Sequence, residues 1–368
     1  MPKPIRILHV LQKMEAGGTQ ALLMNIYRNI DRNKVQFDFL VVNSQKEFYD
    51  DEILSMGGKI YYSNLRESKN IYGYQKLLKK ILIKNKYKII HVHAYTIGYF
   101  TLKTAAKYNV PVRIAHSHNN STTKDNKYLI KKILQKLYLL YATDLFACSK
   151  EAGEYLFKNQ KFTVLNNSID SQKFLFDYKI RNKVRKSLNL KDELLIGHVG
   201  RLHEQKNHKF LIEIFEEIKK KNKYAKLLLV GNGPLENQIL TQIKQKNLNN
   251  DIIYLKNRTD VNELYMAMDV FVLPSLFEGL GIVAVEAQAA GTPCVTSNTL
   301  PIESIVTPLC KQLSLKIKPE IWANEVIEMS KNYDKHENMQ EYIIKADYDI
   351  VKTSEFIQNY YLQKNKIN

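Results

Sequence analysis

Short apolar runs alternate with longer amphipathic segments along almost the whole chain of 368 residues. The runs have the length and the branched apolar side chains of buried strands, and the segments between them have the length of helices. This alternation predicts βα units, in which parallel strands form a sheet that helices cover on both faces. The first series of predicted strands comprises Ile5–Leu11, Phe37–Val42, Lys59–Tyr61, Ile89–His93, Val112–Ala115, Asp144–Cys148 and Phe162–Leu165. Predicted helices between them include Ala21–Asn29, Tyr72–Ile83 and Asn126–Tyr141.

A second series of strands follows a polar, charged stretch at residues 170–190, where we expect the domain junction. Its predicted members are Leu194–Val199, Lys226–Val230, Ile252–Leu255, Val270–Leu273 and Pro293–Thr296. A chain of this length is natural for two hydrophobic cores. We therefore predict an α/β protein with two Rossmann-like domains that face each other across a cleft, one over residues 1–175 and one over residues 185–345. Such folds bind ligands at the carboxyl ends of their parallel strands.

Composition and cysteine usage set further bounds. Hydrophobic residues make up 45% of the chain, which is enough for a globular fold. Cys148, Cys294 and Cys310 lack the spacing of a disulfide framework or a zinc site. No run approaches the roughly 18 apolar residues of a membrane span, and the N-terminus lacks the apolar core of a signal peptide. We therefore expect a soluble protein of a reducing, cytoplasmic compartment.

The formal net charge of +18 has several possible sources. A nucleic acid, an anionic membrane, an anionic substrate or a biased base composition of the gene would each account for it. The sequence contains no helix-turn-helix, no RNA-recognition signature and no aromatic stacking platform. We therefore expect no nucleic-acid partner, and the charge alone does not identify another.

Residues 270–296 say most about function. Strand Val270–Leu273 leads into a Pro-Ser turn, the sequence Glu-Gly-Leu-Gly and a predicted helix of small residues. Glu278 and Glu286 are eight positions apart there, so we expect Glu278 at the helix N-terminus and Glu286 two turns further along the same helix. The N-terminus of a helix attracts anions, and carboxylates accept hydrogen bonds from vicinal hydroxyls. Together these features suit a nucleotide diphosphate sugar.

Two further features are suited to phosphate. Arg201 and Lys206 follow strand Leu194–Val199 in one loop, where an arginine fork and a lysine point charge can straddle a diphosphate. Gly17 and Gly18 follow the first strand and allow backbone N–H groups to approach a phosphate closely. The glycines form neither a Walker loop nor a complete dinucleotide fingerprint.

An ordered set of motifs covers nearly the whole sequence. It comprises Gly17-Gly18-Thr19, HVHAYTIG (91–98), RIAHSHNN (113–120), ACS (147–149), VLNNSID (164–170), GHVGRLHEQKNH (197–208), LLLVGNGPLENQI (227–239) and the block from Glu278 to Glu286. In this order the motifs resemble those of the retaining family-four glycosyltransferases, which have the GT-B fold. The resemblance implies a metal-independent hexosyltransferase that moves a sugar from a nucleotide diphosphate sugar, expected to be a UDP-sugar, to a glycan or lipid-linked saccharide. Its expected role is capsule, exopolysaccharide or cell-wall synthesis.

The resemblance also assigns roles to the domains. It implies that the N-terminal domain binds the acceptor and that the C-terminal domain binds the nucleotide sugar. The final helix, at about residues 350–368, is then expected to pack back on the N-terminal domain.

The resemblance further implies the site residues. The expected catalytic residues are Glu278, Arg201, Lys206 and a histidine after strand Val112–Ala115, for which His118 is favoured over His116. Glu286 is expected to bind the ribose diol, Glu278 the transferred sugar, and Arg201 with Lys206 the diphosphate. The other expected substrate-binding residues are Gly17, Gly18, Gly231, Asn257, Arg258, Gly279, Leu280 and Gly281.

The histidine pairs His91/His93 and His116/His118 raise the question of a metal. A His-x-His pair on a strand can chelate a metal ion, but no third ligand is evident from the sequence. Since Arg201 and Lys206 can neutralise a diphosphate, we expect no metal and no cofactor.

The predicted helix Asn126–Tyr141 is strongly amphipathic. It places Lys127, Lys131, Lys132 and Lys136 on one side and Ile130, Ile133, Leu134, Leu137 and Tyr141 on the other. One interpretation is a core-packed helix with a solvated lysine face; the other is a helix that lies on an anionic bilayer. Six further lysines at residues 76–88 favour peripheral contact with the inner face of the plasma membrane.

Two other functions share parts of this pattern. A sugar-nucleotide epimerase of related fold is the first, although the E-x7-E arrangement does not fit it. An NAD-type oxidoreductase is the second, because doubly wound sheets are common to both classes. The incomplete glycine fingerprint argues against the oxidoreductase, and so does Asn43, which stands where an acidic residue should end the second strand.

Overall fold

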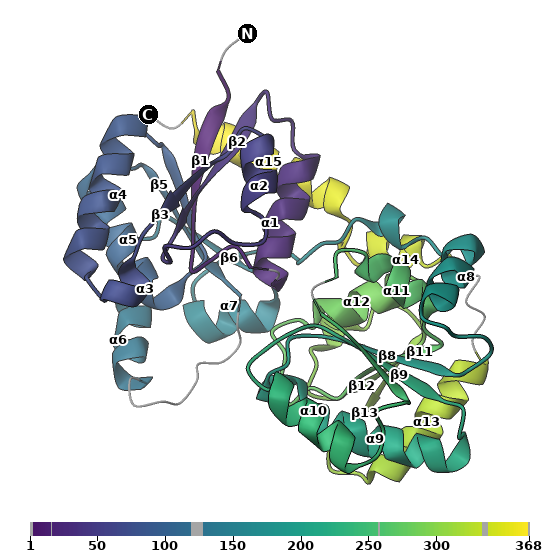
Figure 1. Cartoon of the computed structure of the whole chain (residues 1–368). Helices are drawn as coiled ribbons and strands as arrows, with labels where there is room; N and C mark the ends of the chain where they lie inside the picture. The colour runs from purple at the N-terminus through teal and green to yellow at the C-terminus, as the bar shows by residue number, and fades with distance from the viewer. Residues whose placement is uncertain (1–2, 16, 119–127, 257, 333–337, 367–368) are drawn as a thin grey trace. The chain divides into compact units, whose positions relative to one another are not determined.

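The computed structural model describes residues 3–366 except residue 16 and residues 119–127, 257 and 333–337. The chain forms two compact units. The N-terminal unit comprises Met1–Ile169 together with Asp349–Asn368, and the C-terminal unit comprises Asp170–Tyr348. Each unit is built around one parallel sheet (Figure 1).

The N-terminal unit contains a seven-stranded sheet in the order β3-β2-β1-β4-β5-β6-β7. Its strands are β1 (Ile5–Leu11), β2 (Val35–Val41), β3 (Lys59–Tyr62), β4 (Ile89–Val92), β5 (Val112–Ser117), β6 (Asp144–Ala147) and β7 (Thr163–Val164). Its helices are α1 (Gly18–Asn29), α2 (Asp50–Ser55), α3 (Leu65–Ser68), α4 (Ile71–Asn85), α5 (Tyr95–Lys107), α6 (Tyr128–Leu139), α7 (Lys150–Phe157) and α15 (Ile350–Lys364). The strand order reverses between β1 and β4, where a doubly wound sheet forms its ligand crevice.

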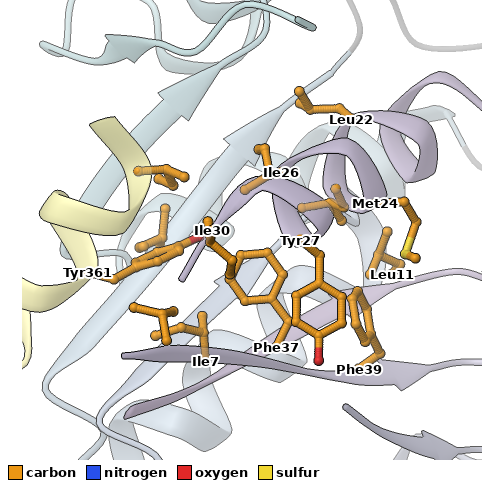
Figure 2. Packing of buried hydrophobic residues seen from close by; sticks show 14 of the residues in the cluster. Ile7, Leu11, Leu22, Met24, Ile26, Tyr27, Ile30, Phe37, Phe39 and Tyr361 are labelled. Carbon is orange, nitrogen blue, oxygen red and sulfur yellow. The ribbon is translucent and has the colours of Figure 1, made fainter. Parts of the chain in front are cut away.

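Helices cover both faces of this sheet. On one face, residues of α1 and α15 pack on β1 and β2, and Figure 2 shows Tyr27, Phe37, Phe39 and Tyr361 in this core. The rings of Tyr27 and Phe37 are stacked with their centroids 5.1 Å apart. On the other face, α4, α5, α6 and α7 form a second buried cluster with the same strands. The last helix of the chain is therefore part of the first sheet's core.

The C-terminal unit contains a six-stranded sheet in the order β10-β9-β8-β11-β12-β13. Its strands are β8 (Leu195–Val199), β9 (Lys226–Val230), β10 (Ile252–Leu255), β11 (Val270–Leu273), β12 (Cys294–Ser297) and β13 (Cys310–Leu313). Its helices are α8 (Tyr178–Ser187), α9 (His208–Lys221), α10 (Glu236–Gln245), α11 (Val261–Ala267), α12 (Ile282–Ala289), α13 (Pro319–Asn332) and α14 (Gln340–Lys345). The order reverses between β8 and β11. Both sheets thus have the Rossmann-like topology that the sequence predicts.

The polar stretch at residues 170–190 contains helix α8. Arg181 donates hydrogen bonds to the carbonyl oxygens of residues 266–268 and forms an ion pair with Asp269 at 2.6 Å. Arg185 contacts the other carboxylate oxygen of Asp269 at 3.2 Å. The charged residues of this stretch therefore fix a helix to the C-terminal sheet, where composition alone suggested a junction.

Truncation of Tyr361 should selectively destabilise the N-terminal unit. Tyr361 is 1% exposed and its hydroxyl lies 2.6 Å from His91 Nδ1. We expect Tyr361→Ala to lower the local free energy of unfolding by about 3–5 kcal/mol, the usual cost of removing a buried aromatic side chain. Hydrogen exchange of the β1 and β2 amides measures this. Phe356→Ala is the control, because Phe356 lies on the same helix and is 46% exposed. Equal protection in the two variants would contradict the packing of α15.

Candidate functional site

A buried ion pair lies just beyond the carboxyl ends of β8 and β11. Lys206 Nζ is 2.6 Å from Glu278 Oε1, and Glu278 is only 6% exposed. The Ser275 hydroxyl donates to the same carboxylate oxygen at 2.7 Å, and Gln205 Nε2 donates to Oε2 at 3.2 Å. A buried carboxylate requires such partners, and here they fix the positions of both charges.

The loops that carry this pair are tied together by backbone contacts. The N–H of Leu276 donates to the Gln205 carbonyl at 2.8 Å, so the loop after β8 contacts the turn after β11. The Ser275 carbonyl accepts from the hydroxyls of Ser297 and Thr299 at 2.6 and 2.7 Å. The site is thus held by loops that follow three strands, β8, β11 and β12.

Helix α12 begins later than the sequence suggests. Its first residue is Ile282, and Gly281 caps it with φ of +79°. Glu278 therefore lies in the turn before the helix, and Glu286 lies little more than one turn inside it, so the prediction that both occupy one helix is wrong. The reason is the left-handed conformation of Gly281, which bends the chain before the helix starts and which a side chain would oppose. Leu280, in the same turn, is buried.

Glu286 lies in a different environment from Glu278. It is partly exposed and accepts a hydrogen bond from the Tyr265 hydroxyl at 3.0 Å. Desolvation raises the pKa of Glu286 to about 7, while the Tyr265 hydrogen bond and the positive charge of Lys206 act in the opposite direction. Near neutral pH this carboxyl group can therefore either donate or accept a hydrogen bond.

The other expected residues of the C-terminal unit differ in their surroundings. Arg201 is exposed on the loop after β8. Gly231 has φ of +138°, and a Cβ there would lie 2.1 Å from the Gly200 carbonyl oxygen. This glycine is thus needed for close packing of the loops after β8 and β9. The Arg258 guanidinium forms an ion pair with Asp260 at 2.5 Å, and Asn257 lies outside the described residues.

In the N-terminal unit, Gly17 and Gly18 stand at the start of α1. Gly17 is the cap and has an extended backbone. A Cβ at Gly17 would lie 2.7 Å from Gln20 Oε1, and Gln20 Nε2 donates to the Lys13 carbonyl at 2.8 Å. The small residue thus leaves room for a side chain that ties α1 to the end of β1.

Five histidines meet on one face of the N-terminal sheet, and we call them the histidine cluster. His9 Nδ1 lies 3.1 Å from His93 Nε2, and His93 Nδ1 lies 2.8 Å from His118 Nε2. His91 Nε2 lies 3.0 Å from His116 Nδ1. The expectation that the histidine pairs lack a third ligand is wrong, because two groups of three histidines have ligand atoms within 4.8 Å of one another. His9 stands alone in the sequence, and only the pairing of β1 with β4 brings it to the others.

Helix α6 exposes its apolar side. Leu129, Ile130 and Ile133 are 75%, 58% and 58% exposed, and Leu140, the residue after the helix, is 71% exposed. Among the described side chains of this helix, the buried ones are Gln135 and Tyr138, and the Tyr138 hydroxyl donates to the Val92 carbonyl at 3.0 Å. Of the two interpretations of this helix, the core-packed one does not hold for Ile130 and Ile133. Lys127 and the side chain of Lys131 lie outside the part of the chain that the structure describes. Among the helices described, none has both the length and the apolar character that a membrane crossing requires.

The pH dependence of stability should report the raised pKa of Glu286. Between about pH 4.5 and pH 7 the folded protein holds a proton on Glu286 that the unfolded chain releases, so stability falls as pH rises through this window. Glu286→Gln keeps the shape of the neutral, protonated carboxyl group but cannot ionise. We expect it to match the wild type at pH 5 and to be more stable at pH 8, by on the order of 2 kcal/mol. Melting temperatures at both pH values measure this, with exposed Glu204→Gln as the control for loss of one carboxylate. An equal effect of Glu286→Gln at both pH values would contradict the assignment.

Comparisons with known proteins agree with this architecture. The family model "Glycosyl transferases group 1" matches residues 180–346, and "Glycosyltransferase Family 4" matches residues 16–173. The crystal structure of Anabaena HepE in complex with UDP and glucose has a TM-score of 0.79 at 17% identity, and the match covers 97% of this chain and 99% of that one. At this identity the likeness concerns the fold, which is that of GT-B glycosyltransferases.

Two curated relatives are similar over most of their length. "Putative glycosyltransferase EpsF" of Bacillus subtilis (strain 168) is 34% identical over 371 residues, which cover 97% of this chain and 96% of the relative. "Capsular polysaccharide biosynthesis glycosyltransferase CapM" of Staphylococcus aureus is 32% identical over 316 residues, covering 77% of this chain and 80% of the relative. The chain belongs to the family-four glycosyltransferases.

Proposed function

We propose that the protein is a retaining hexosyltransferase that moves a sugar from a UDP-sugar to a lipid-linked saccharide in capsule, exopolysaccharide or cell-wall synthesis. The observation that carries the proposal is the Lys206–Glu278 pair beyond the carboxyl ends of β8 and β11. Two comparisons support it. The HepE structure, which has the same fold, was determined in complex with UDP and glucose, and CapM is named as a glycosyltransferase of capsular polysaccharide biosynthesis. The family assignment does not favour an epimerase or an oxidoreductase.

Lys206 is the residue on which donor activation depends. Its ammonium group has three N–H donors, of which one is directed at Glu278, so others remain for a diphosphate oxygen. Arg201, exposed on the same loop, supplies a second cation. As the sugar–phosphate bond breaks, the leaving UDP gains negative charge, so these contacts strengthen in the transition state. These side-chain cations thereby neutralise the charge on the leaving diphosphate, a role that a metal ion has in other enzymes.

The two glutamates bind and orient the nucleotide sugar. Glu286 binds the ribose diol, and its capacity both to donate and to accept near neutral pH suits a pair of vicinal hydroxyls. Glu278 contacts hydroxyls of the transferred sugar and keeps Lys206 in position. The acceptor hydroxyl attacks from the face that UDP leaves, which retains the anomeric configuration without a covalent glycosyl-enzyme.

Loss of either cation should impair turnover. We expect Arg201→Ala and Lys206→Ala each to lower kcat by about 10- to 100-fold, equivalent to about 1.5–3 kcal/mol for a charge-assisted hydrogen bond. Lys209→Ala is the matched control, because Lys209 is an exposed lysine three residues further on. Release of the nucleoside diphosphate (UDP, GDP or ADP) from a panel of the corresponding sugars, with melting curves to verify folding, measures this.

The same assay tests the rest of the proposal. The activity should persist in excess EDTA, and NMR of the first-formed product should give the anomeric configuration of the donor. Near-wild-type turnover in both variants, full loss in EDTA or an inverted product would each contradict the proposed mechanism.

The exposed face of α6 supports contact with an anionic membrane. Its apolar side chains stand beside exposed Lys136, and six exposed lysines at residues 76–88 lie on or next to α4. Helices α4, α5 and α6 cover the same face of the N-terminal sheet. An apolar stripe flanked by cations matches the headgroup region of an anionic leaflet. We assign the protein to peripheral contact with the inner face of the plasma membrane, where a lipid-linked acceptor would lie.

Removal of the apolar stripe should weaken membrane binding. We expect wild type to sediment with vesicles that contain anionic lipid and to be released at 1 M salt, where screening shortens electrostatic reach to about 3 Å. Ile130→Ser/Ile133→Ser should bind at least about tenfold more weakly, because each loses roughly 1.5–3 kcal/mol of apolar burial. The control is Ile302→Ser/Val351→Ser, at side chains that are 70% and 60% exposed elsewhere. Equal sedimentation of both double variants would contradict the role of α6.

A further inference from the structure

The histidine cluster is built by strand pairing rather than by any local motif. His9 is the register partner of His91 across β1 and β4, and the pairs His91/His93 and His116/His118 each point to one face because strand residues alternate. His9, His91, His93 and His116 are 0%, 1%, 9% and 0% exposed, and His118 is partly exposed. The cluster thus extends from a sealed interior towards the carboxyl ends of the strands.

Burial keeps these rings neutral. It lowers the pKa of His9 and of His118 to about 3, and it lowers the pKa values of His91, His93 and His116 well below the ordinary value. A neutral imidazole carries one N–H group and one lone pair, and the lone pair is what a metal ion requires.

The hydrogen bonds within the cluster cannot satisfy every ring. Two chains run through it, one from Tyr361 through His91 to His116 and one from His9 through His93 to His118. His9 Nε2 and His116 Nε2 are buried without a hydrogen-bond partner among the described residues. Whichever tautomers are present, these two ring nitrogens lack a hydrogen bond within the described part of the chain. A buried polar atom without a partner typically lowers stability by about 1–3 kcal/mol. A bound cation would remove that cost at a nitrogen that carries a lone pair.

The two groups of three histidines share His93. One is His9, His91 and His93; the other is His93, His116 and His118. Ligand nitrogens bound to one tetrahedral Zn²⁺ lie roughly 3.4 Å apart, given Zn–N bonds of about 2.0–2.1 Å. The His93 and His118 nitrogens that face each other are already 2.8 Å apart, so small ring rotations would suffice. The second group also lies at the strand ends and contains His118, which is partly exposed, whereas His9 and His91 of the first group are buried.

We propose that His93, His116 and His118 form a site for one divalent transition-metal ion that prefers imidazole nitrogen, with Zn²⁺ as the representative ion. Three histidines and a solvent molecule are an accepted zinc ligand set, and the water or hydroxide offsets the charge that the neutral rings cannot. His9 and His91 contact these ligands and fix their tautomers, as outer-shell partners of metal-binding histidines commonly do.

The site has a consequence for turnover that rests on the proposed function. His118 and His116 are the candidate histidines for contact with the donor sugar, and a ring bound to a metal cannot serve that role. Added Zn²⁺ should therefore inhibit transfer, and EDTA should reverse the inhibition. The inhibition of transfer by Zn²⁺ is measured with substrates, whereas metal binding itself is measured without them.

The test uses the full-length chain purified without a polyhistidine tag and stripped of metal. Titration with Co²⁺ should give the visible absorption of four-coordinate cobalt at one equivalent per chain, and Zn²⁺ should displace it. His93→Ala, His116→Ala and His118→Ala should each weaken Zn²⁺ binding at least about 100-fold. His9→Ala should weaken it about 10- to 100-fold, as removal of an outer partner does. His203→Ala, at an exposed histidine of the C-terminal unit, is the control and should bind as the wild type does.

A second substitution keeps the proposal testable if alanine variants unfold. His116→Cys retains a metal ligand and should add a thiolate-to-cobalt charge-transfer band in the near ultraviolet. Absence of one-equivalent binding in the wild type, or equal binding in wild type and His93→Ala, would overturn the site. Loss of binding in His9→Ala and His91→Ala with retention in His116→Ala would also overturn it, in favour of the sealed group. These readouts do not involve transfer, so failure of the proposed function would leave them intact.

Discussion

Parallel pairing of the strands governs where chemistry can occur in this protein. Every strand pair that the structure describes, in both sheets, is parallel, so each helix carries the chain back and each strand ends at the same edge as its neighbours. Loops from distant parts of the sequence therefore meet at two edges. At one edge they bring Lys206 to Glu278, 72 residues apart in the chain. At the other they bring His9, His93 and His118 into one chain of ring nitrogens.

At these edges, the desolvation cost of buried polar side chains is compensated by hydrogen bonds to different degrees. Glu278 has three donors around its carboxylate and is in effect a fixed part of the scaffold. Glu286 has the Tyr265 phenol, and its pKa is raised to about 7 as a result of its surroundings. The histidine cluster satisfies most of its ring nitrogens internally, but His9 Nε2 and His116 Nε2 have no hydrogen-bond partner among the described residues. Incomplete compensation is unfavourable for stability, and such positions are where a ligand has most to contribute.

Much of the fold follows from periodicity, because buried parallel strands are short continuous apolar runs. Strand Ile5–Leu11 and strand Val270–Leu273 have the predicted bounds, and most other predicted strands differ by one or two residues. Strand β13 escaped detection, since Cys310–Leu313 is a partly exposed edge strand with mixed polarity. The start of α12 was misplaced because a helical pattern does not reveal a glycine in the left-handed conformation.

For the candidate site, the sequence identified residue types but could not supply contacts. The E-x7-E spacing located Glu278 and Glu286, yet their unequal burial depends on Ser275, Gln205 and Tyr265, which no local pattern connects to them. The sequence also left open which face of α6 packs on the core. Amphipathic spacing divides a helix into two sides, but Gly98 decides which side packs: it admits the Tyr138 ring so closely that a Cβ would lie 2.3 Å away. The apolar side is left to the surface.

The place of α15 in the first core has a consequence for how the chain is made. The N-terminal unit requires Ile350, Ile357 and Tyr361 to complete the cluster around β1 and β2, yet the whole of Asp170–Tyr348 is synthesised in between. At about 5–20 residues per second, that interval is on the order of ten to forty seconds. The second unit is contiguous and can finish folding first, while the earlier sheet waits with one apolar face open. The order in which the two units are synthesised therefore does not fix the order in which their cores can be completed.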